Sequence, residues 1–162
     1  MSIYRSVRAV TGASGDGPVD WNAVGDAAKA ATDPGDIDVP ANERAAYADD
    51  VGDARDRIRR VTALDFDLPD TVEIQSRHHW IDANIATFER VMAPIESRAE
   101  YIPGVARMVN TGSMALALSF LSNNVLGQYD PLLLADGDDH KLYFVRPNIR
   151  RVAETLDVSY PR

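Results

Sequence analysis

The spacing of apolar positions along the chain predicts a mainly helical protein. Between residues 40 and 63, apolar side chains recur four and three positions apart, which places them on one face of a helix. They are Tyr47, Val51, Ala54, Ile58 and Val61. We expect this helix to pack along its whole length.

A second helix with the same spacing is predicted to start after Ser76, which is a good N-cap residue. Its apolar face is formed by Ile81, Ile85, Phe88, Met92 and Ile95. Pro94 removes one backbone hydrogen bond, so we expect the helix to kink or end near residues 91–93.

The most apolar stretch, residues 105–126, predicts the central helix of the fold. Positions 114–121 are apolar on nearly every side, which is typical of a helix buried on several faces. Gly127 is the expected left-handed C-cap of this helix. We expect the core to consist mainly of this helix and the strand that follows it, with Leu116, Phe120, Leu121, Val125, Tyr143 and Val145 as its main residues.

Strand signals flank this helix. Residues 132–134 and 141–145 enclose the polar sequence ADGDD, which predicts an antiparallel hairpin at about 131–146. TVEIQ at 71–75 predicts another short strand. Shorter helices are expected at 21–31, capped by Asp20, and at 149–156, capped by Asn148. The predicted fold class is therefore mainly α with a small antiparallel β-hairpin, an α+β fold.

The domain organisation follows from the distribution of glycine, serine and proline. These residues are concentrated in TGASGDGP, so residues 1–18 are predicted to be a flexible N-terminal segment. Residues 19–162 are predicted to form a single helical domain, which is long enough to bury a core.

The composition narrows the classes of function. The net charge is −8, and nothing resembles the basic stripe with which proteins neutralise nucleic-acid phosphates, so we expect no nucleic-acid partner. The longest apolar run is five residues, far below the ~20 of a membrane span, so we expect no membrane partner. The chain has no cysteine, which fits a reducing, cytoplasmic location. Aspartate is abundant and Lys29 and Lys141 are the only lysines, a bias that indicates either a salt-loving organism or GC-rich coding.

Candidate metal ligands are few. The histidines are His78, His79 and His140, and the side chains of the adjacent pair point about 100° apart on a helix. His78 and His79 are thus weak metal candidates, and structural roles are favoured for both. The acidic turn 136–139 offers oxygen ligands for calcium but lacks the spacing of an EF-hand loop. Residues 128–130, Gln-Tyr-Asp, are interpreted as hydrogen-bonding partners of backbone groups at the helix end. No sequence motif of a serine hydrolase, NTPase or dinucleotide-binding protein is present.

Several segments resemble one known family. FLSNNVLGQYDPLLL and LYFVRPNI, together with VDWNAV, HHWIDANIATFERVMAPIE and NTGSMALALSFL, are similar to zincin-like metallopeptidases, which are often labelled as hydrolases associated with deazaflavin-coenzyme biosynthesis. The resemblance implies the helical part of a zincin-like fold. It also implies that relatives bind zinc through an HExxH helix that follows the PNI sequence, and that extended peptide adds to the sheet near strand 141–145.

The sequence ends at Tyr160-Pro161-Arg162, where the resemblance places the zinc helix, and HExxH is absent. No residue therefore inherits a catalytic or cofactor-binding role. We interpret the chain as an N-terminal scaffold that is inactive alone, whether as an expressed fragment, a shortened reading frame or a degenerate paralogue. Its expected partner is the missing C-terminal half or a second copy. The alternative is a non-enzymatic helical interaction module.

Overall fold

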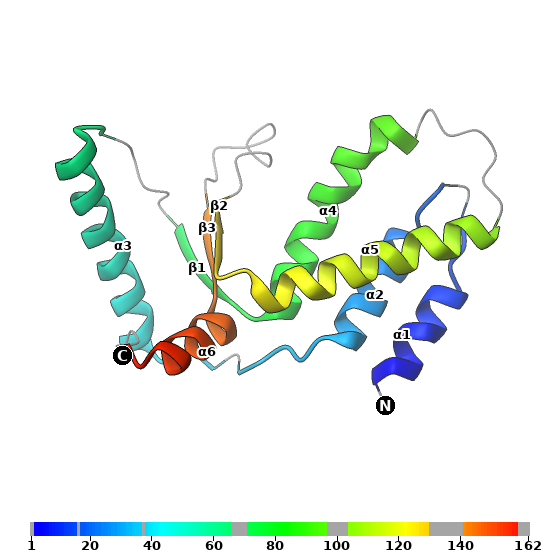
Figure 1. Cartoon of the computed structure of the whole chain (residues 1–162), viewed down its shortest axis with the longest axis horizontal. Coiled ribbons are helices and arrows are strands. Elements are labelled where there is room, and N and C mark those ends of the chain that lie inside the picture. Colours follow the sequence, from blue (N-terminus) through cyan, green and yellow to red (C-terminus); the bar gives the residue numbers. More distant parts are fainter. Residues whose placement is uncertain are drawn as a thin grey trace. The chain divides into compact units, whose positions relative to one another are not determined.

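The computed structural model of the chain describes residues 2–15, 17–36, 38–65, 71–96, 104–129 and 141–158 (Figure 1). Its contacts divide into two compact units, each assembled from two separate stretches of sequence. The helical unit comprises Met1–Gly35 and Ser76–Val125, and the sheet unit comprises Asp36–Gln75 and Leu126–Arg162. The predicted α+β class is confirmed, because helices predominate and a small sheet accompanies them.

The helical unit contains α1 (Ser2–Thr11), α2 (Trp21–Ala31), α4 (Arg77–Glu96) and α5 (Gly104–Asn124). Helix α2 packs against all three others and begins, as predicted, after the N-cap Asp20. Its buried residues are mostly small, which lets the neighbouring helices approach closely. At Gly25 an added Cβ would lie 2.7 Å from Cδ1 of Ile85, so a larger residue would force the end of the Ile85 side chain to move. The alanine-rich α2, and not α5, is the centre of this unit.

Helix α5 is buried on one face only, which corrects the expectation of burial on several sides. Its buried residues are Thr111, Ala115, Leu118 and Ser122. Leu116 and Phe120, both predicted for the core, have exposed fractions of 71% and 68%, and Leu121 and Val125 are half-buried. Hydrophobicity all round the helix misled the prediction, because the neighbouring helices cover a single face and leave the opposite apolar face open.

Two other predicted helices form with corrected details. Helix α4 starts after Ser76, whose Oγ accepts a hydrogen bond from the backbone N–H of His79 at 3.1 Å, and it continues past Pro94 to Glu96. Helix α3 (Ala41–Thr62) does not pack along its length. Tyr47 is buried, whereas Ile58 and Val61 are exposed by 47% and 87%, so its apolar face is covered only in its N-terminal half.

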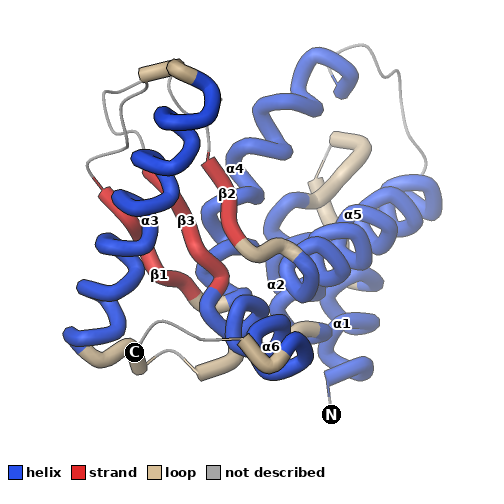
Figure 2. Tube along the Cα trace, turned by 60° about the vertical axis from the view of Figure 1, so that its left-hand side comes forward, coloured by secondary structure: helices blue, strands red, loops and turns tan. Residues whose placement is uncertain are grey.

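The sheet unit combines α3 with β1 (Thr71–Gln75), β2 (Gly127–Tyr129), β3 (Lys141–Val145) and α6 (Arg146–Leu156) (Figure 2). The strand order is β1-β3-β2, with β1 parallel and β2 antiparallel to β3. The predicted strand at 71–75 is confirmed. The antiparallel partner of β3 is β2, whereas the partner predicted for the hairpin, residues 132–134, lies outside the described residues.

Gly127 is a strand residue, so its prediction as a left-handed C-cap is wrong. It pairs with Phe144, and an added Cβ would lie 2.9 Å from the carbonyl oxygen of Tyr143. The glycine is needed for close approach of two strands and not for a positive φ angle. Strand β3 is the middle strand of the described sheet, so both of its own edges are occupied. The extended peptide that the resemblance implies would have to add beside β1 or β2, and that expectation remains a prediction.

The end of β3 leads directly into α6. Tyr143 and Val145 are buried, as predicted, and the ring of Phe144 contacts that of Tyr47 at 5.4 Å between centroids. Helix α6 begins at Arg146, earlier than predicted, because the proline at 147 is tolerated in a first helical turn. Asn148 is therefore fully buried inside that turn instead of capping it.

Within residues 1–18, α1 packs on α2, and Ser6 Oγ donates a hydrogen bond to the carbonyl oxygen of Ala27 at 3.1 Å. The flexibility expected for this segment, and the single domain expected after it, remain predictions.

Candidate functional site

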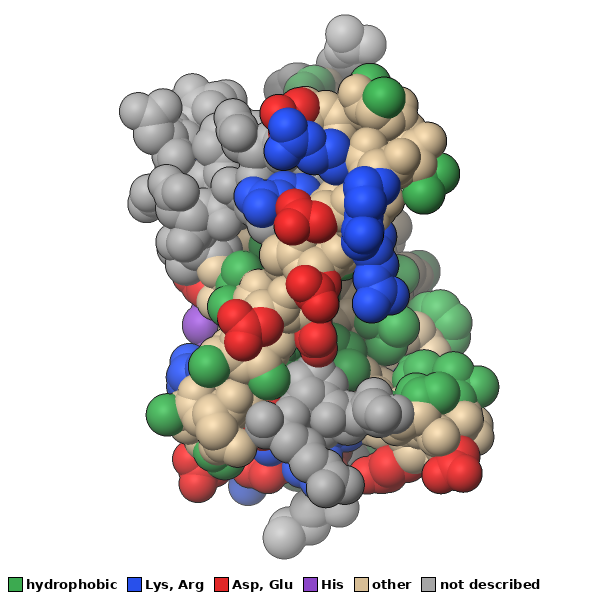
Figure 3. Space-filling view, turned by 90° about the vertical axis from the view of Figure 1, so that its left-hand side faces the viewer, with side chains coloured by type: hydrophobic (Ala, Val, Ile, Leu, Met, Phe, Trp, Pro, Cys, Tyr) green, Lys and Arg blue, Asp and Glu red, His purple; other side chains and the backbone are tan. Residues whose placement is uncertain are grey.

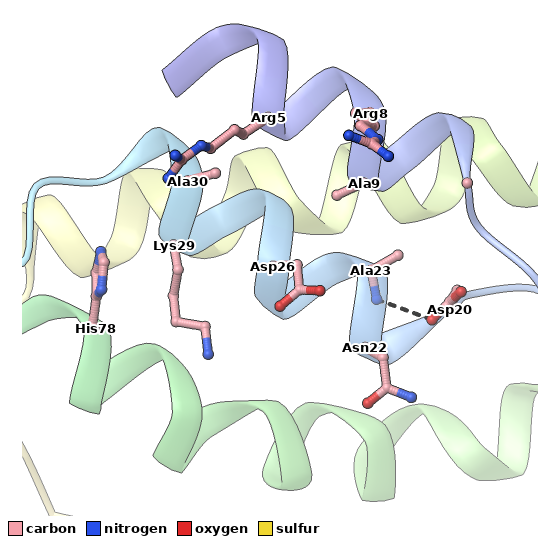
Figure 4. Close-up of a pocket in the computed structure, with 11 residues that line it drawn as sticks. Arg5, Arg8, Ala9, Asp20, Asn22, Ala23, Asp26, Lys29, Ala30 and His78 are labelled. Atoms are coloured by element: carbon pink, nitrogen blue, oxygen red, sulfur yellow. Dashed lines mark hydrogen bonds between the residues drawn. The ribbon is translucent and has the colours of Figure 1, made fainter. Parts of the chain in front are cut away.

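A groove of about 950 Å³, with many polar and charged side chains in its lining, lies between α1, α2 and α4 of the helical unit (Figure 4). Helix α1 supplies Arg5 and Arg8, which lie three positions apart and therefore on one side of that helix. Helix α2 supplies Asn22, Asp26 and Lys29, which extend towards α4. The groove thus mixes cations and carboxylates and has no single sign of charge.

Asp20, at one end of the groove, is occupied by structural hydrogen bonds. Its Oδ1 accepts from the backbone N–H of Ala23 at 3.0 Å, and its Oδ2 accepts from that of Ser14 at 2.8 Å. Its own backbone N–H donates to Oγ1 of Thr111 at 3.0 Å. This carboxylate fixes the start of α2 and the loop before it, which is the role expected of an N-cap.

Lys29 forms an ion pair with Asp82 of α4, with Nζ 2.7 Å from Oδ1. The two side chains are 32% and 54% exposed, so solvent weakens the attraction and the pair contributes little to stability. Arg5 and Arg8 are exposed on the opposite side of the groove. The groove is therefore suited to contacts with polar groups.

His78 lies at the other end of the groove, and its Nε2 is 2.7 Å from the carbonyl oxygen of Thr32. Because a carbonyl oxygen only accepts, Nε2 must carry a hydrogen in this bond, and Nδ1 is left as the nitrogen with a free lone pair in the neutral ring. His79 is exposed on α4 outside the groove lining. The structure gives His78 a structural hydrogen bond and does not bring the two rings together at one site.

The described residues do not fit a zinc ion. Zinc sites in proteins use three or four His, Cys or carboxylate ligands, and no group of three such side chains comes together in the described ranges. The candidate calcium turn at 136–139 and His140 lie outside those ranges. Of the segment 128–130, Gln128 and Tyr129 are strand residues of β2, and Asp130 lies outside the described part of the chain. No catalytic step through a metal can be built on these side chains.

The sheet unit contains a buried ion pair that the sequence did not reveal. Arg146 and Glu43 are each 5% exposed, and the guanidinium holds the carboxylate with two bonds, Nε to Oε1 at 2.6 Å and Nη2 to Oε2 at 2.8 Å. The pair joins the first turn of α3 to the first turn of α6, positions that lie far apart in sequence. No local pattern could have indicated it.

Asp36 completes this cluster from the surface. Nη1 of Arg146 lies 3.1 Å from Oδ2 of Asp36 and also donates to its backbone carbonyl oxygen at 3.3 Å. A hydrogen bond from the backbone N–H of Asp38, and then that of Arg146, lower the pKa of the Asp36 carboxyl below its ordinary value. The side chains of Arg146, Glu43 and Asp36 thus all stabilise the sheet unit.

The exposed face of α3 carries many charged side chains (Figure 3). Arginine and aspartate side chains are interleaved there, and the ion pairs include Arg55 with Asp56 at 3.1 Å and Arg59 with Asp65 at 3.3 Å. All four side chains are well exposed. Such pairs are typical of a solvated helix face, and the mixed signs offer no concentrated field for a charged ligand.

Comparison with known proteins adds a family. A family model described as zincin-like metallopeptidase matches residues 19–161. Among solved structures, the chain is similar to a crystal structure of a candidate hydrolase with a novel fold from Chloroflexus aurantiacus, with 29% identity and a TM-score of 0.68. The match covers 87% of this chain and 46% of the other, so this chain spans about half the length of that relative. No curated protein matches the chain. No helix in the described part is both long and apolar enough to cross a membrane.

Proposed function

Because the chain belongs to the zincin-like metallopeptidase family, we propose that it provides the scaffold of a zinc-dependent peptidase or hydrolase and is inactive by itself. The family resemblance seen in the sequence is confirmed by the match over residues 19–161. Zinc in such enzymes activates a water molecule for attack on a carbonyl group. In this proposal the ligands for that ion come from a different polypeptide segment.

One observation carries the proposal: family membership extends over nearly the whole chain, yet its described residues assemble no zinc ligand set. HExxH is absent from the sequence, and the one histidine in the groove already donates Nε2–H to a backbone carbonyl. The residues that the chain does arrange precisely are structural. They include the N-cap Asp20 and the buried pair of Arg146 and Glu43.

Metal analysis tests the proposal directly. We expect the protein, after exhaustive chelation and titration with zinc, to retain no stoichiometric tightly bound ion and to show no peptidase activity on unstructured peptide substrates. His78→Ala and His79→Ala serve as matched variants, because the two residues are adjacent and only His78 lies in the groove. One equivalent of zinc that disappears in either variant, or hydrolysis that depends on added zinc, would contradict the proposal.

A second candidate function is a non-enzymatic helical interaction module. The exposed apolar face of α5 favours it, because contiguous apolar surface on a folded protein commonly marks an interaction site. The two candidate functions predict different responses to an added zinc-binding segment. A scaffold gains activity when the zinc-binding segment of a relative is supplied in trans, whereas an interaction module gains none.

A further inference from the structure

An exposed apolar stripe runs along α5. It is formed by four large side chains whose exposed fractions lie between 59% and 71%, namely Val105, Val109, Leu116 and Phe120. At about 100° per residue, these positions fall within about 60° of one another around the helix axis. The stripe therefore forms one face on a single helix, and the described residues of the helical unit leave it exposed.

The stripe borders an apolar groove of about 360 Å³ between α1 and α5, with α2 as its floor. Helix α1 contributes Val7 and Val10 to this groove, and Val109 and Leu116 belong to both the groove and the stripe. Val7, like Ile3 on the same helix, is itself largely exposed. A helix laid along the stripe would thus also place side chains against α1.

This face also avoids charge. The chain carries 17 basic and 25 acidic residues, yet α5 has Arg107 as its single charged residue, and that guanidinium donates to the carbonyl oxygen of Gly17. Two copies of a protein with a net charge of −8 repel each other over most of their surfaces. Arg107 lies about 140° or more around the helix axis from every residue of the stripe, so contact through the stripe brings no like charges of α5 together.

The spacing of the residues in the stripe is the same in both directions. The spacing from Val105 to Phe120 is four, seven and four, with large side chains at the ends and the small residues Gly112 and Ser113 in the middle. In an antiparallel pair of such helices related by a two-fold axis, Val105 opposes Phe120 of the other copy, and Val109 opposes Leu116. An interface of this symmetry requires a patch that complements itself, and this stripe has that property.

We propose that the α5 stripe is a self-association surface, on which a second copy of this chain packs its own α5 in antiparallel orientation. The small residues at the centre allow the helix backbones to approach, and the four large side chains of each copy close the interface on both sides. The inference does not depend on whether the chain supports a zinc site.

Sedimentation equilibrium of the full chain gives the first test. We expect a dimer whose dissociation constant rises at least tenfold in the variant Leu116→Glu/Phe120→Glu. Val61→Glu is the matched control, because Val61 is 87% exposed on α3 of the sheet unit and should not alter the equilibrium. Circular dichroism of each variant verifies that the helices are retained, since all three substituted residues are exposed.

Disulfide cross-linking tests whether the two α5 helices are antiparallel. Because the chain has no cysteine, each introduced cysteine is the sole thiol of its copy. Ser113→Cys places one thiol beside the proposed axis, so mild oxidation should link two copies. Val105→Cys places the thiol about 22 Å along the helix from the equivalent residue of an antiparallel partner, so it should not link to itself. A mixture of Val105→Cys and Phe120→Cys should give a mixed dimer.

Three outcomes would overturn the proposal. One is a protein that stays monomeric at every concentration up to about 100 μM, roughly 100 times a micromolar dissociation constant. Another is equal cross-linking of Ser113→Cys and Val105→Cys, which would indicate a parallel or non-specific contact. The third is a monomer that forms a one-to-one complex with the remaining portion of the Chloroflexus relative, lost in Leu116→Glu/Phe120→Glu, which would assign the stripe to a different polypeptide.

Discussion

Removal of Glu43 from its buried pair with Arg146 should be among the most destabilising single changes in the sheet unit. In Glu43→Ala the guanidinium, 5% exposed, loses two charge-assisted bonds of 2.6 and 2.8 Å. Breaking a buried pair on one side typically costs about 3–5 kcal/mol, because an uncompensated charge is left out of water. Asp36 still contacts Nη1, so we expect a loss of free energy of unfolding near the lower end, about 3 kcal/mol.

Urea unfolding followed by circular dichroism measures this loss. For a protein of this size each kcal/mol lowers the midpoint temperature by about 2–4 °C, so thermal unfolding should shift by about 6–12 °C. Asp56→Ala is the matched control, because its ion pair with Arg55 is exposed and should contribute less than about 1 kcal/mol. The double variant Glu43→Leu/Arg146→Met removes both charges at once and should be far less destabilised than the sum of the two single changes.

A loss below about 1 kcal/mol for Glu43→Ala, comparable with Asp56→Ala, would refute the reasoning from burial. So would simple additivity in the double variant, because it would mean that the two side chains do not interact in the folded protein. A change in the urea dependence, without a change in midpoint, would instead indicate an altered denatured state.

Two further predictions concern the sheet unit. Gly127→Ala should destabilise the protein by about 1–3 kcal/mol in urea unfolding, because its Cβ would meet the Tyr143 carbonyl oxygen at 2.9 Å, whereas Gly52→Ala, with open space around it, should be neutral or stabilising. Since the pKa of Asp36 is lower in the folded protein than its ordinary value of 3.8, this carboxylate stabilises the fold above that value and ceases to do so as the pH falls through the folded pKa. In Asp36→Asn the free energy of unfolding should therefore fall less steeply as the pH is lowered from 5 to 2 than it does in the unchanged protein. An unchanged slope over this range would contradict the assignment.

Local patterns in the sequence predicted the helices well. Asp20 and Ser76 are N-caps whose side chains accept hydrogen bonds from backbone N–H groups three residues later. A short window of sequence therefore suffices to find them. Spacing of four and three likewise located α3 and α4. The strand at 71–75 was found for a similar reason, as a run of alternating residues between turn signals.

Long-range features were beyond such reasoning. Hydrophobicity shows that Leu116 and Phe120 favour burial, but only the arrangement of neighbouring helices decides which side of α5 is covered. The role of Gly127 depends on a strand fourteen or more residues later, and the bond between Arg146 and Glu43 joins positions 103 apart. For the candidate site, the sequence favoured a structural role for His78 over a metal-binding one, but it could not place this residue in a groove with Arg5 and Arg8 of α1.

The way in which the two units are built from alternating stretches has a consequence for folding. The chain leaves the helical unit at Gly35, returns at Ser76 and leaves again after Val125, so neither unit is a continuous piece of sequence. Strand β1 can pair with β3 only after the whole of α4 and α5 has been made, and parallel pairings of such high contact order form slowly. The entropic cost of closing this loop grows only with the logarithm of the loop length. The long separation of β1 and β3 should therefore slow folding more than it lowers the stability of the folded protein. A nascent chain would therefore expose β1 as an unpaired strand until β3 is synthesised, which makes this segment the expected point of misfolding during translation.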